Sequence, residues 1–199
     1  MKHNRLCVLT VSLVFMMALS AFAQKSKPQK SAKKPATTET AVKANASNSR
    51  NQEKVKDLVA FLQLLLNTLG SNASSARDKE IVITESYAKL FRDSKVQIED
   101  DLAESRSTIT NKDVVAYLKD VDFFFENVSF EFLIEDIKEG VNANGQVFYK
   151  VSLRRNLSGT TASGKKINNT IPRFIEINYD PLAEDLKIAS IYTNEFDEK

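Results

Sequence analysis

The sequence has little of the chemistry on which many enzymes depend. Its 199 residues include one cysteine, Cys7, and one histidine, His3. Both lie in an N-terminal segment that we predict to be removed, so the mature chain would contain neither residue. Serine–histidine–aspartate and cysteine–histidine catalysis are thereby excluded, as are the usual zinc sites built on His and Cys. Carboxylate, tyrosine and lysine chemistry remain open, and a chain exported without disulfides must be held together by its hydrophobic core.

The N-terminal segment has the parts of a secretory signal peptide. Two basic residues precede an apolar run, Leu6–Leu19, and Ala21-Phe22-Ala23 places small residues at the two positions that a signal peptidase reads. We therefore expect a signal peptide over residues 1–23, with cleavage before Gln24. The alternative is an uncleaved membrane anchor, because the apolar run approaches the ~20 residues that span a bilayer. The favoured interpretation places the mature protein in the periplasm or outside the cell, with no stable membrane insertion after cleavage.

Residues 24–52 contain almost no large apolar side chain, and we predict that they form a disordered basic tether. They carry seven basic residues and one acidic residue, whereas the chain after Gln52 carries 19 basic and 25 acidic residues. A basic tail thus precedes an acidic domain, which argues against nucleic acid as the main partner. The tail acts either as a solvated spacer or as a contact to anionic envelope polymers or lipid headgroups.

Apolar residues recur at helical spacing in the first half of the predicted folded domain, residues 53–199. The predicted helices are Val55–Leu69, which Gly70 ends, then roughly Ser74–Arg92, and Val114–Phe125, with a short strand at Val96–Ile98 before the third helix. Thr110 and Asp113 form an approximate capping box for that helix. Phe125 is expected in the core. Phe124 lies about 100° away around the helix, so its burial distinguishes a packed interior from an open cavity.

The second half of the domain has the period-two alternation of antiparallel strands. Val128–Glu135 and Val147–Leu153 alternate, and Asn144-Gly145 between them is typical of a hairpin with a type I′ turn. In that register, the charged pairs that meet across the two strands are Glu131 and Glu135 with Lys150 and Arg154.

The remaining strands are predicted at Ile171–Ile177 and Leu186–Tyr192. Pro172 is expected near the start of its strand, where the missing backbone N–H donor of proline costs least. The polar stretch 157–166 before them is either a long hairpin tip or a mobile flap.

From Val55 to Thr193 this order of elements resembles the nuclear transport factor 2-like (cystatin-like, ketosteroid isomerase-like) cone fold. The residues that carry the resemblance are the opening apolar helix, the helix end Ser86-Tyr87-Ala88-Lys89-Leu90-Phe91, the helix Val114–Phe125 and the strand Leu186–Tyr192. The predicted fold class is therefore α+β, with three N-terminal helices packed on a curved, mainly antiparallel sheet. With its signal peptide and tether, the chain also resembles uncharacterised exported proteins of Bacteroidota-type bacteria.

The resemblance implies a pocket between the sheet and the helices, where enzymes of the family usually place Asp, His, Tyr or Arg. The candidate ligand-binding residues are Tyr87, Tyr117, Phe124 and Tyr149, and the alternative is that the tyrosines pack in the core with their hydroxyls at its edge. Asp100-Asp101 and Asp120-Val121-Asp122 lack the spacing of a calcium-binding loop, so we expect these carboxylates to be solvated. We assign no catalytic residue, metal or cofactor.

The favoured interpretation is an exported, non-catalytic binding or assembly module of the cell envelope. Its expected partner is an envelope protein or a small apolar ligand, and a homodimer through the sheet is left open. The alternative is a small-molecule enzyme of the isomerase or hydratase type that uses Asp and Tyr in the cone pocket. A deep pocket with a carboxylate at its floor would favour the enzyme, and a pocket filled by Phe123, Phe124 and their neighbours would favour the module.

Overall fold

The computed structural model describes residues 37–102, 108, 110–180 and 182–194, with side chains from Ser49 onward. These residues belong to one unit that begins at Thr37. The predicted signal peptide and residues 24–36 of the predicted tether lie outside the described residues. Among the helices that are described, none has the length and apolar character needed to cross a membrane.

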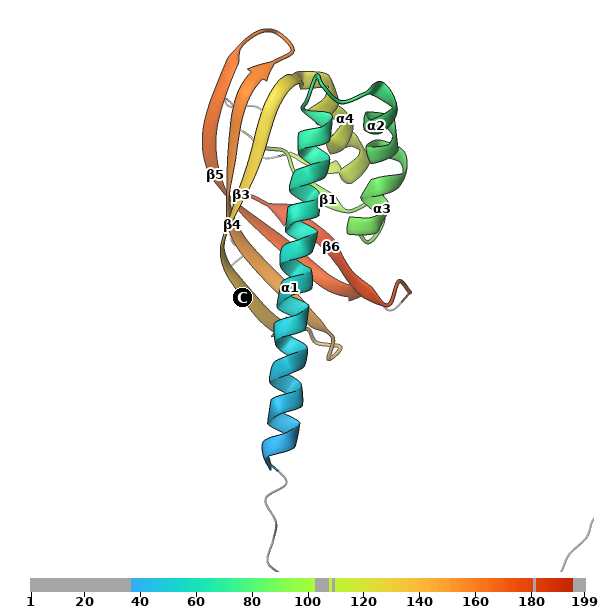
Figure 1. Ribbon diagram of the computed structural model, residues 1–199, viewed down its shortest axis with the longest axis vertical. Helices are drawn as coiled ribbons and strands as arrows, with labels where there is room; N and C mark the ends of the chain where they lie inside the picture. The colour runs from blue at the N-terminus through green and yellow to red at the C-terminus, as the bar shows by residue number, and fades with distance from the viewer. Residues whose placement is uncertain (1–36, 103–107, 109, 181, 195–199) are drawn as a thin grey trace, which may run out of the picture. The chain divides into compact units, whose positions relative to one another are not determined.

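The first helix, α1 (Thr37–Leu69), is longer than the sequence pattern indicates. Residues 37–52, where the sequence predicts a disordered tether, form its first turns, which extend beyond the sheet in Figure 1. The physical reason is that adding a residue to an existing helix is far easier than starting one. The helix is anchored further on, by a buried stripe that comprises Val55, Val59, Leu62, Leu65, Leu66 and Leu69.

The second predicted helix is present but interrupted. It consists of α2 (Ala76–Ile81), a π-helical turn (Val82–Ser86) and α3 (Tyr87–Leu90). Ser75 is its N-cap, because the Ser75 hydroxyl accepts a hydrogen bond of 3.1 Å from the amide of Asp78.

The third helix, α4 (Val114–Phe124), is confirmed, but the capping box predicted before it is wrong. Residues Asn111–Asp113 form the short strand β2 instead, and Asp113 is itself the N-cap, without a side-chain cap bond. Its carboxylate accepts hydrogen bonds from Lys95 at 3.0 Å and from Gln97 at 2.6 Å. The Asp113 side chain thus ties the edge strand β2 to Lys95 and Gln97 of the neighbouring segment rather than capping a helix.

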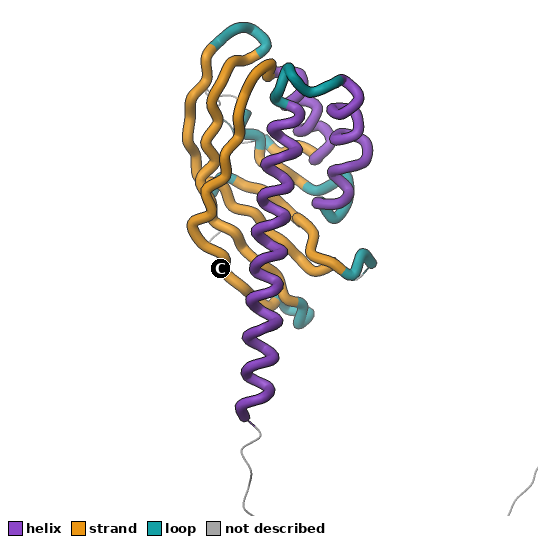
Figure 2. Tube along the Cα trace, viewed as in Figure 1, coloured by secondary structure: helices purple, strands orange, loops and turns teal. Residues whose placement is uncertain are grey.

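The strands form one six-stranded sheet in the order β2-β1-β6-β5-β4-β3. Strands β1 and β6 run parallel, and the other pairs are antiparallel. The helices lie on one side of the curved sheet (Figures 1 and 2), which confirms the α+β fold class. Besides β2, the strands are β1 (Gln97–Glu99), β3 (Phe125–Val141), β4 (Val147–Thr161), β5 (Lys166–Asp180) and β6 (Asp185–Tyr192).

The turn between β3 and β4 is not the predicted type I′ turn. Gly145 has a positive φ of 77°, but its amide donates to the carbonyl of Asn142 at 2.9 Å, which closes a three-residue loop ending in a left-handed glycine. Asn-Gly is compatible with either loop length. The longer loop shifts the register by one residue.

The shifted register changes the charged pairs on the outer face. Glu131 lies opposite Asn156 and accepts a hydrogen bond of 2.9 Å from its amide, instead of meeting a basic residue. The Glu135–Arg154 pair is nevertheless formed, at 2.5 Å, next to a bulge between Ile134 and Asp136.

The polar stretch after Arg155 belongs to the second hairpin. Strands β4 and β5 extend through it, and only residues 162–165 form the tip. Pro172 therefore lies well inside β5, not near its start. It is tolerated because β5 pairs with β6 only from Phe174 onward, so Pro172 sits where β5 has a neighbour on one side alone.

Candidate functional site

The interior of the cone holds a cluster of charged and polar side chains between the sheet and α4. Asp101, just after β1, forms ion pairs through Oδ2 with Nε of Arg155 on β4, at 2.9 Å, and with Nε of Arg173 on β5, at 3.5 Å. Its Oδ1 accepts a hydrogen bond of 2.9 Å from the hydroxyl of Tyr117 on α4. Both oxygens of the carboxylate are thus engaged. We call these four residues the interior cluster.

Asp100, the neighbouring acid, has a separate partner. Lys112 on β2 lies 2.6 Å from its Oδ2 and also contacts Asp120 on α4. Burial by itself lowers the pKa of Lys112, but the two carboxylates outweigh it, so the net pKa is raised.

The expectation that these carboxylates are solvated is wrong for Asp100 and Asp101, which are only 6% and 9% exposed. Asp120 and Asp122 stay partly exposed and are paired with Lys112 and Lys79. Carboxylates are rarely buried without a counter-charge, and Asp100 and Asp101 have lysine or arginine partners from other strands.

Tyr117 is held as a protonated hydrogen-bond donor. Burial raises the pKa of the Tyr117 hydroxyl well above its ordinary value, and the negative charge of Asp101 adds to that effect. The cavity beside the interior cluster measures about 10 Å³, which is no more than the space of one water molecule. A substrate therefore has no room next to Asp101 and Tyr117 in this arrangement.

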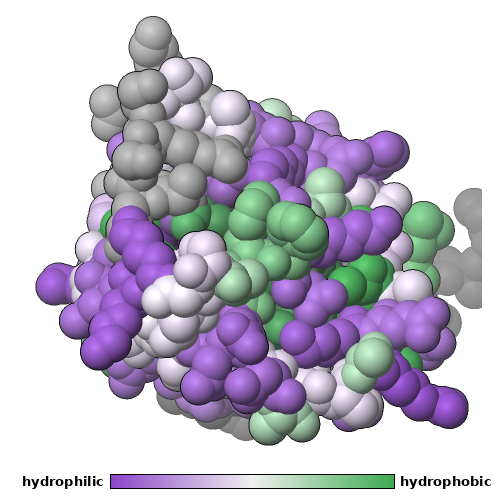
Figure 3. Space-filling view, turned by 90° about the horizontal axis from the view of Figure 1, so that it is seen from above, coloured by the Kyte–Doolittle hydropathy of each residue, from purple (hydrophilic) through white to green (hydrophobic). Residues whose placement is uncertain are grey.

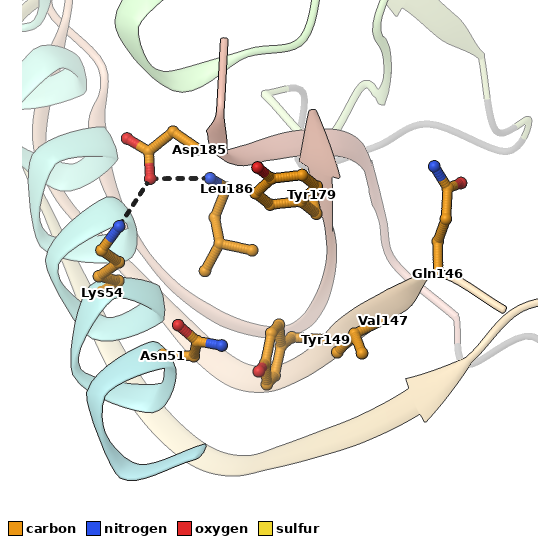
Figure 4. Close-up of a pocket in the computed structure, with 8 residues that line it drawn as sticks. All are labelled: Asn51, Lys54, Gln146, Val147, Tyr149, Tyr179, Asp185 and Leu186. Atoms are coloured by element: carbon orange, nitrogen blue, oxygen red, sulfur yellow. Dashed lines mark hydrogen bonds and ion pairs between the residues drawn. The ribbon is translucent and has the colours of Figure 1, made fainter. Parts of the chain in front are cut away.

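A larger pocket lies at the other end of the sheet, beside α1 (Figure 4). Its volume is about 290 Å³, and we call it the α1 pocket. Figure 4 shows the side chains of Tyr149, Tyr179 and Leu186 directed at one space, with α1 along one side. The lining residues are Asn51 and Lys54 from α1, Gln146, Val147 and Tyr149 from the first hairpin, Tyr179 from β5, and Asp185 and Leu186 from β6.

The charges of the α1 pocket are already paired. Nζ of Lys54 lies 3.1 Å from Oδ1 of Asp185, and both side chains are about half exposed. Burial tends to raise the pKa of Asp185, but the amide of Leu186 and the Lys54 ammonium group outweigh it and lower the pKa. Burial also raises the pKa of Tyr149, with a further contribution from the Glu139 carboxylate that Asn51 opposes.

The four candidate residues from the sequence do not share one site. Tyr117 belongs to the interior cluster and Tyr149 to the α1 pocket. Tyr87 is partly buried against the core at the start of α3. Phe124 is 46% exposed at the end of α4, lines neither space, and contacts Phe123 edge to face at 5.1 Å. Phe123 and Phe124 are both exposed, so they do not fill the interior as the module interpretation expected.

The sequence interpretation missed the two interior arginines, although a signal for both was present. Arg155 continues the inward-facing series Tyr149, Val151, Leu153 on β4, and Arg173 lies in the same phase as Ile175 and Ile177 on β5. A charged residue in phase with the apolar face of a strand must find a buried counter-charge. That rule identifies both arginines, but not their partner.

The end of the molecule where α4 passes into β3 carries a patch of hydrophobic surface surrounded by hydrophilic residues (Figure 3). Phe123, which is 75% exposed, and Phe124 are the large exposed apolar residues at the end of α4. The two rings contact each other edge to face on this surface.

Comparison with known proteins places the fold. No protein-family model matches the sequence, and no curated protein matches it either. A nuclear transport factor 2-like superfamily protein from Salmonella enterica superposes with a TM-score of 0.52 at 8% identity, covering 76% of this chain and 94% of that one. The chain therefore has the nuclear transport factor 2-like fold, as the sequence pattern suggested. At this identity the likeness shows the fold alone.

Two further solved structures are similar at lower scores. The association domain of CaMKII from C. elegans gives a TM-score of 0.43 at 10% identity, covering 71% of this chain and 95% of that one. A protein with a cystatin-like fold from Caulobacter vibrioides gives 0.45 at 12% identity, covering 71% of this chain and 87% of that one.

Proposed function

We propose that this chain is a non-catalytic binding or assembly module of the cell envelope, whose partner is an envelope protein or a small apolar ligand. The observation that supports this most directly is the occupied interior. Asp101 has Tyr117, Arg155 and Arg173 on its two oxygens, and about 10 Å³ of space lies beside it. A general base must come within hydrogen-bond reach of a substrate proton. An enclosed and neutralised carboxylate does not, so we assign the interior cluster a structural role rather than a catalytic one.

An isomerase or hydratase type of enzyme is the second candidate. One observation favours it: a buried carboxylate hydrogen-bonded to a tyrosine of raised pKa is a pair that such chemistry can use. For this pair to act on a substrate, however, Arg155 and Arg173 would have to leave the carboxylate and open a cavity.

The stability of Tyr117→Phe distinguishes the two candidates. In the module, the substitution removes a partner from a buried carboxylate and should lower the free energy of unfolding by roughly 1–3 kcal/mol. Residues kept for catalysis often reduce stability, so their removal is neutral or stabilising. Tyr87→Phe is the matched control, because the Tyr87 ring is only partly buried. A Tyr117→Phe protein at least as stable as wild type in urea would favour the enzyme.

The envelope location is part of the same proposal and rests on the signal-like segment before Gln24. Mass spectrometry of the protein isolated from its native host should find Gln24 at the N-terminus. A product that retains Met1 would place the module elsewhere or anchor it in the membrane.

A further inference from the structure

We propose that the α1 pocket binds a neutral ligand that contains one ring and one hydrogen-bonding group. The inference rests on the proposed binding function and names the ligand class and the site. The ring would lie among the apolar side chains of the pocket, and the polar group would reach the amides of Asn51 or Gln146 at its rim.

The size of the pocket fits one ring. A cavity of ~150 Å³ in another protein holds benzene, and the α1 pocket measures about 290 Å³. That volume lies just below the range for small-molecule sites, which begins at ~300 Å³. A ring with a substituent therefore fits the α1 pocket, and larger drug-sized ligands do not.

The walls of the pocket are aliphatic and aromatic. Val147 and Leu186 supply aliphatic surface, and Tyr149 and Tyr179 supply ring faces. Tyr149 is fully buried, so its ring is a fixed wall of the pocket, and Tyr179 is partly exposed at the mouth. Tyrosine offers a large apolar face with little conformational freedom to lose, which suits it to hold a ring.

The charges around the pocket disfavour a charged ligand. Lys54 and Asp185 neutralise each other at 3.1 Å, so a cation would compete with Lys54 and an anion would compete with Asp185. Either competition leaves one wall charge without its partner. Beyond this pair, Glu139 near the Tyr149 hydroxyl and Lys187 near Asp185 carry opposite charges, so neither sign of ligand charge gains an advantage. A neutral ligand leaves the pair intact, so we expect it to bind more tightly than either a cation or an anion.

Three probes that share one ring test this expectation. Benzyl alcohol, benzylamine and benzoate are titrated at pH 7 into the ¹⁵N-labelled full chain, and amide shifts are followed by NMR. Benzyl alcohol should shift the amides of Val147, Tyr149, Tyr179 and Leu186 in a saturable way, with a Kd on the order of 1 mM. Benzylamine and benzoate should bind at least about tenfold more weakly, which corresponds to a difference of ~1.4 kcal/mol.

Three variants test where the ligand binds and how its charge affects its affinity. Tyr179→Ala should weaken benzyl alcohol at least about fivefold, because it removes an aromatic wall. Phe123→Ala, an exposed aromatic at the end of α4 outside the pocket, should leave the Kd unchanged. Lys54→Met frees the Asp185 carboxylate and should raise the affinity for benzylamine relative to benzyl alcohol, an effect that lost stability alone does not produce.

The outcomes separate this inference from the proposed function. Benzylamine binding as tightly as benzyl alcohol to the wild type would overturn the neutral-ligand assignment. If none of the three probes shifts amides at the α1 pocket or at the interior cluster, the assignment of the α1 pocket as a ligand site is overturned. The proposed binding module would be unaffected by that result. Probe-induced shifts centred on Asp101 and Tyr117 would contradict the closed interior, and with it the proposed function.

Discussion

Asp101 and Arg155 form an ion pair of 2.9 Å with both side chains only 2% exposed, although 54 residues separate them in the sequence. The Nε–Oδ2 contact lacks the geometry of a hydrogen bond, so the attraction between them is chiefly one of charge. Burying such a pair has a large desolvation cost that the mutual attraction offsets only in part. The pair fixes the placement of the segment after β1 against β4, and the contact of Asp101 with Arg173 does the same for β5.

Removing the charge of Asp101 should be strongly destabilising. Asp101→Asn leaves both Arg155 and Arg173 buried without their counter-charge, and breaking a buried pair in this way costs roughly 3–5 kcal/mol. Urea unfolding measures the change. Asp57→Asn, at an exposed position of α1, is the control and should stay within about 0.5 kcal/mol of wild type. A loss below about 1 kcal/mol for Asp101→Asn would mean that the cluster is hydrated.

Tyr117 should make the protein less stable in alkali. Its pKa is raised in the folded state, so between its ordinary value of about 10 and the folded value the unfolded chain loses a proton that the folded chain keeps. Stability contributed by this group is therefore complete below pH ~10 and falls above it, by at most ~1.4 kcal/mol per pH unit.

The control for this pH dependence is Tyr117→Phe. Lys112, whose pKa is also raised, loses its stabilising charge in the same direction above pH ~10.4 and is present in both proteins. Urea midpoints between pH 8 and 11 should therefore fall more steeply for wild type than for Tyr117→Phe. Parallel curves would show that the Tyr117 hydroxyl is accessible to solvent.

Two adjacent phenylalanines should differ sharply in their contribution to stability. Phe125 is 3% exposed and packs edge to face on Phe130 at 6.1 Å, so Phe125→Ala should cost roughly 3–5 kcal/mol. Phe124 is 46% exposed, and Phe124→Ala should cost less than about 1.5 kcal/mol. Urea unfolding of both variants decides this. Equal losses would mean that Phe124 is covered in solution, for example by a partner.

Periodicity in the sequence predicts most of this fold because it reports burial directly. The alternation around Val151 and Leu153 and the helical stripe around Leu62 are consequences of having one buried face, so they can be read locally. The turn at Gly145 shows the limit of local signals. Asn-Gly permits two loop lengths, and the one adopted depends on the pairing of whole strands.

The candidate sites were less predictable, for two physical reasons. Asp101 is buried only because Arg155 and Arg173 reach it from other strands. No residue near Asp101 in the sequence indicates that these two arginines are its partners. The α1 pocket depends on Asn51 and on Lys54, which lie where the polar composition gives way to the apolar stripe. Composition does not record that α1 continues through that stretch, so only Tyr149 of this pocket was identified from the sequence.

Strand β3 lies at the edge of the sheet, and α1 supplies hydrogen bonds there in place of a further strand. The Asn67 side chain accepts a hydrogen bond from the amide of Phe130 at 2.7 Å and donates one to its carbonyl at 3.0 Å. Gln63 accepts a bond of 2.6 Å from the amide of Phe132 in the same way. Unpaired edges invite pairing with other chains, so these side chains protect the strand as well as orient the helix.

Asn67→Ala should therefore loosen the edge of β3. Both backbone groups of Phe130 lose their partner in a partly buried setting, which should cost roughly 1–3 kcal/mol of stability. Amide hydrogen exchange at Phe130 should accelerate by more than the global loss of stability explains, because the edge opens locally. Asn168→Ala, at an exposed position of β5, is the control and should leave the exchange of Phe130 unchanged. Exchange at Phe130 that stays as slow in Asn67→Ala as in wild type would show that packing, and not the Asn67 amide, protects this edge.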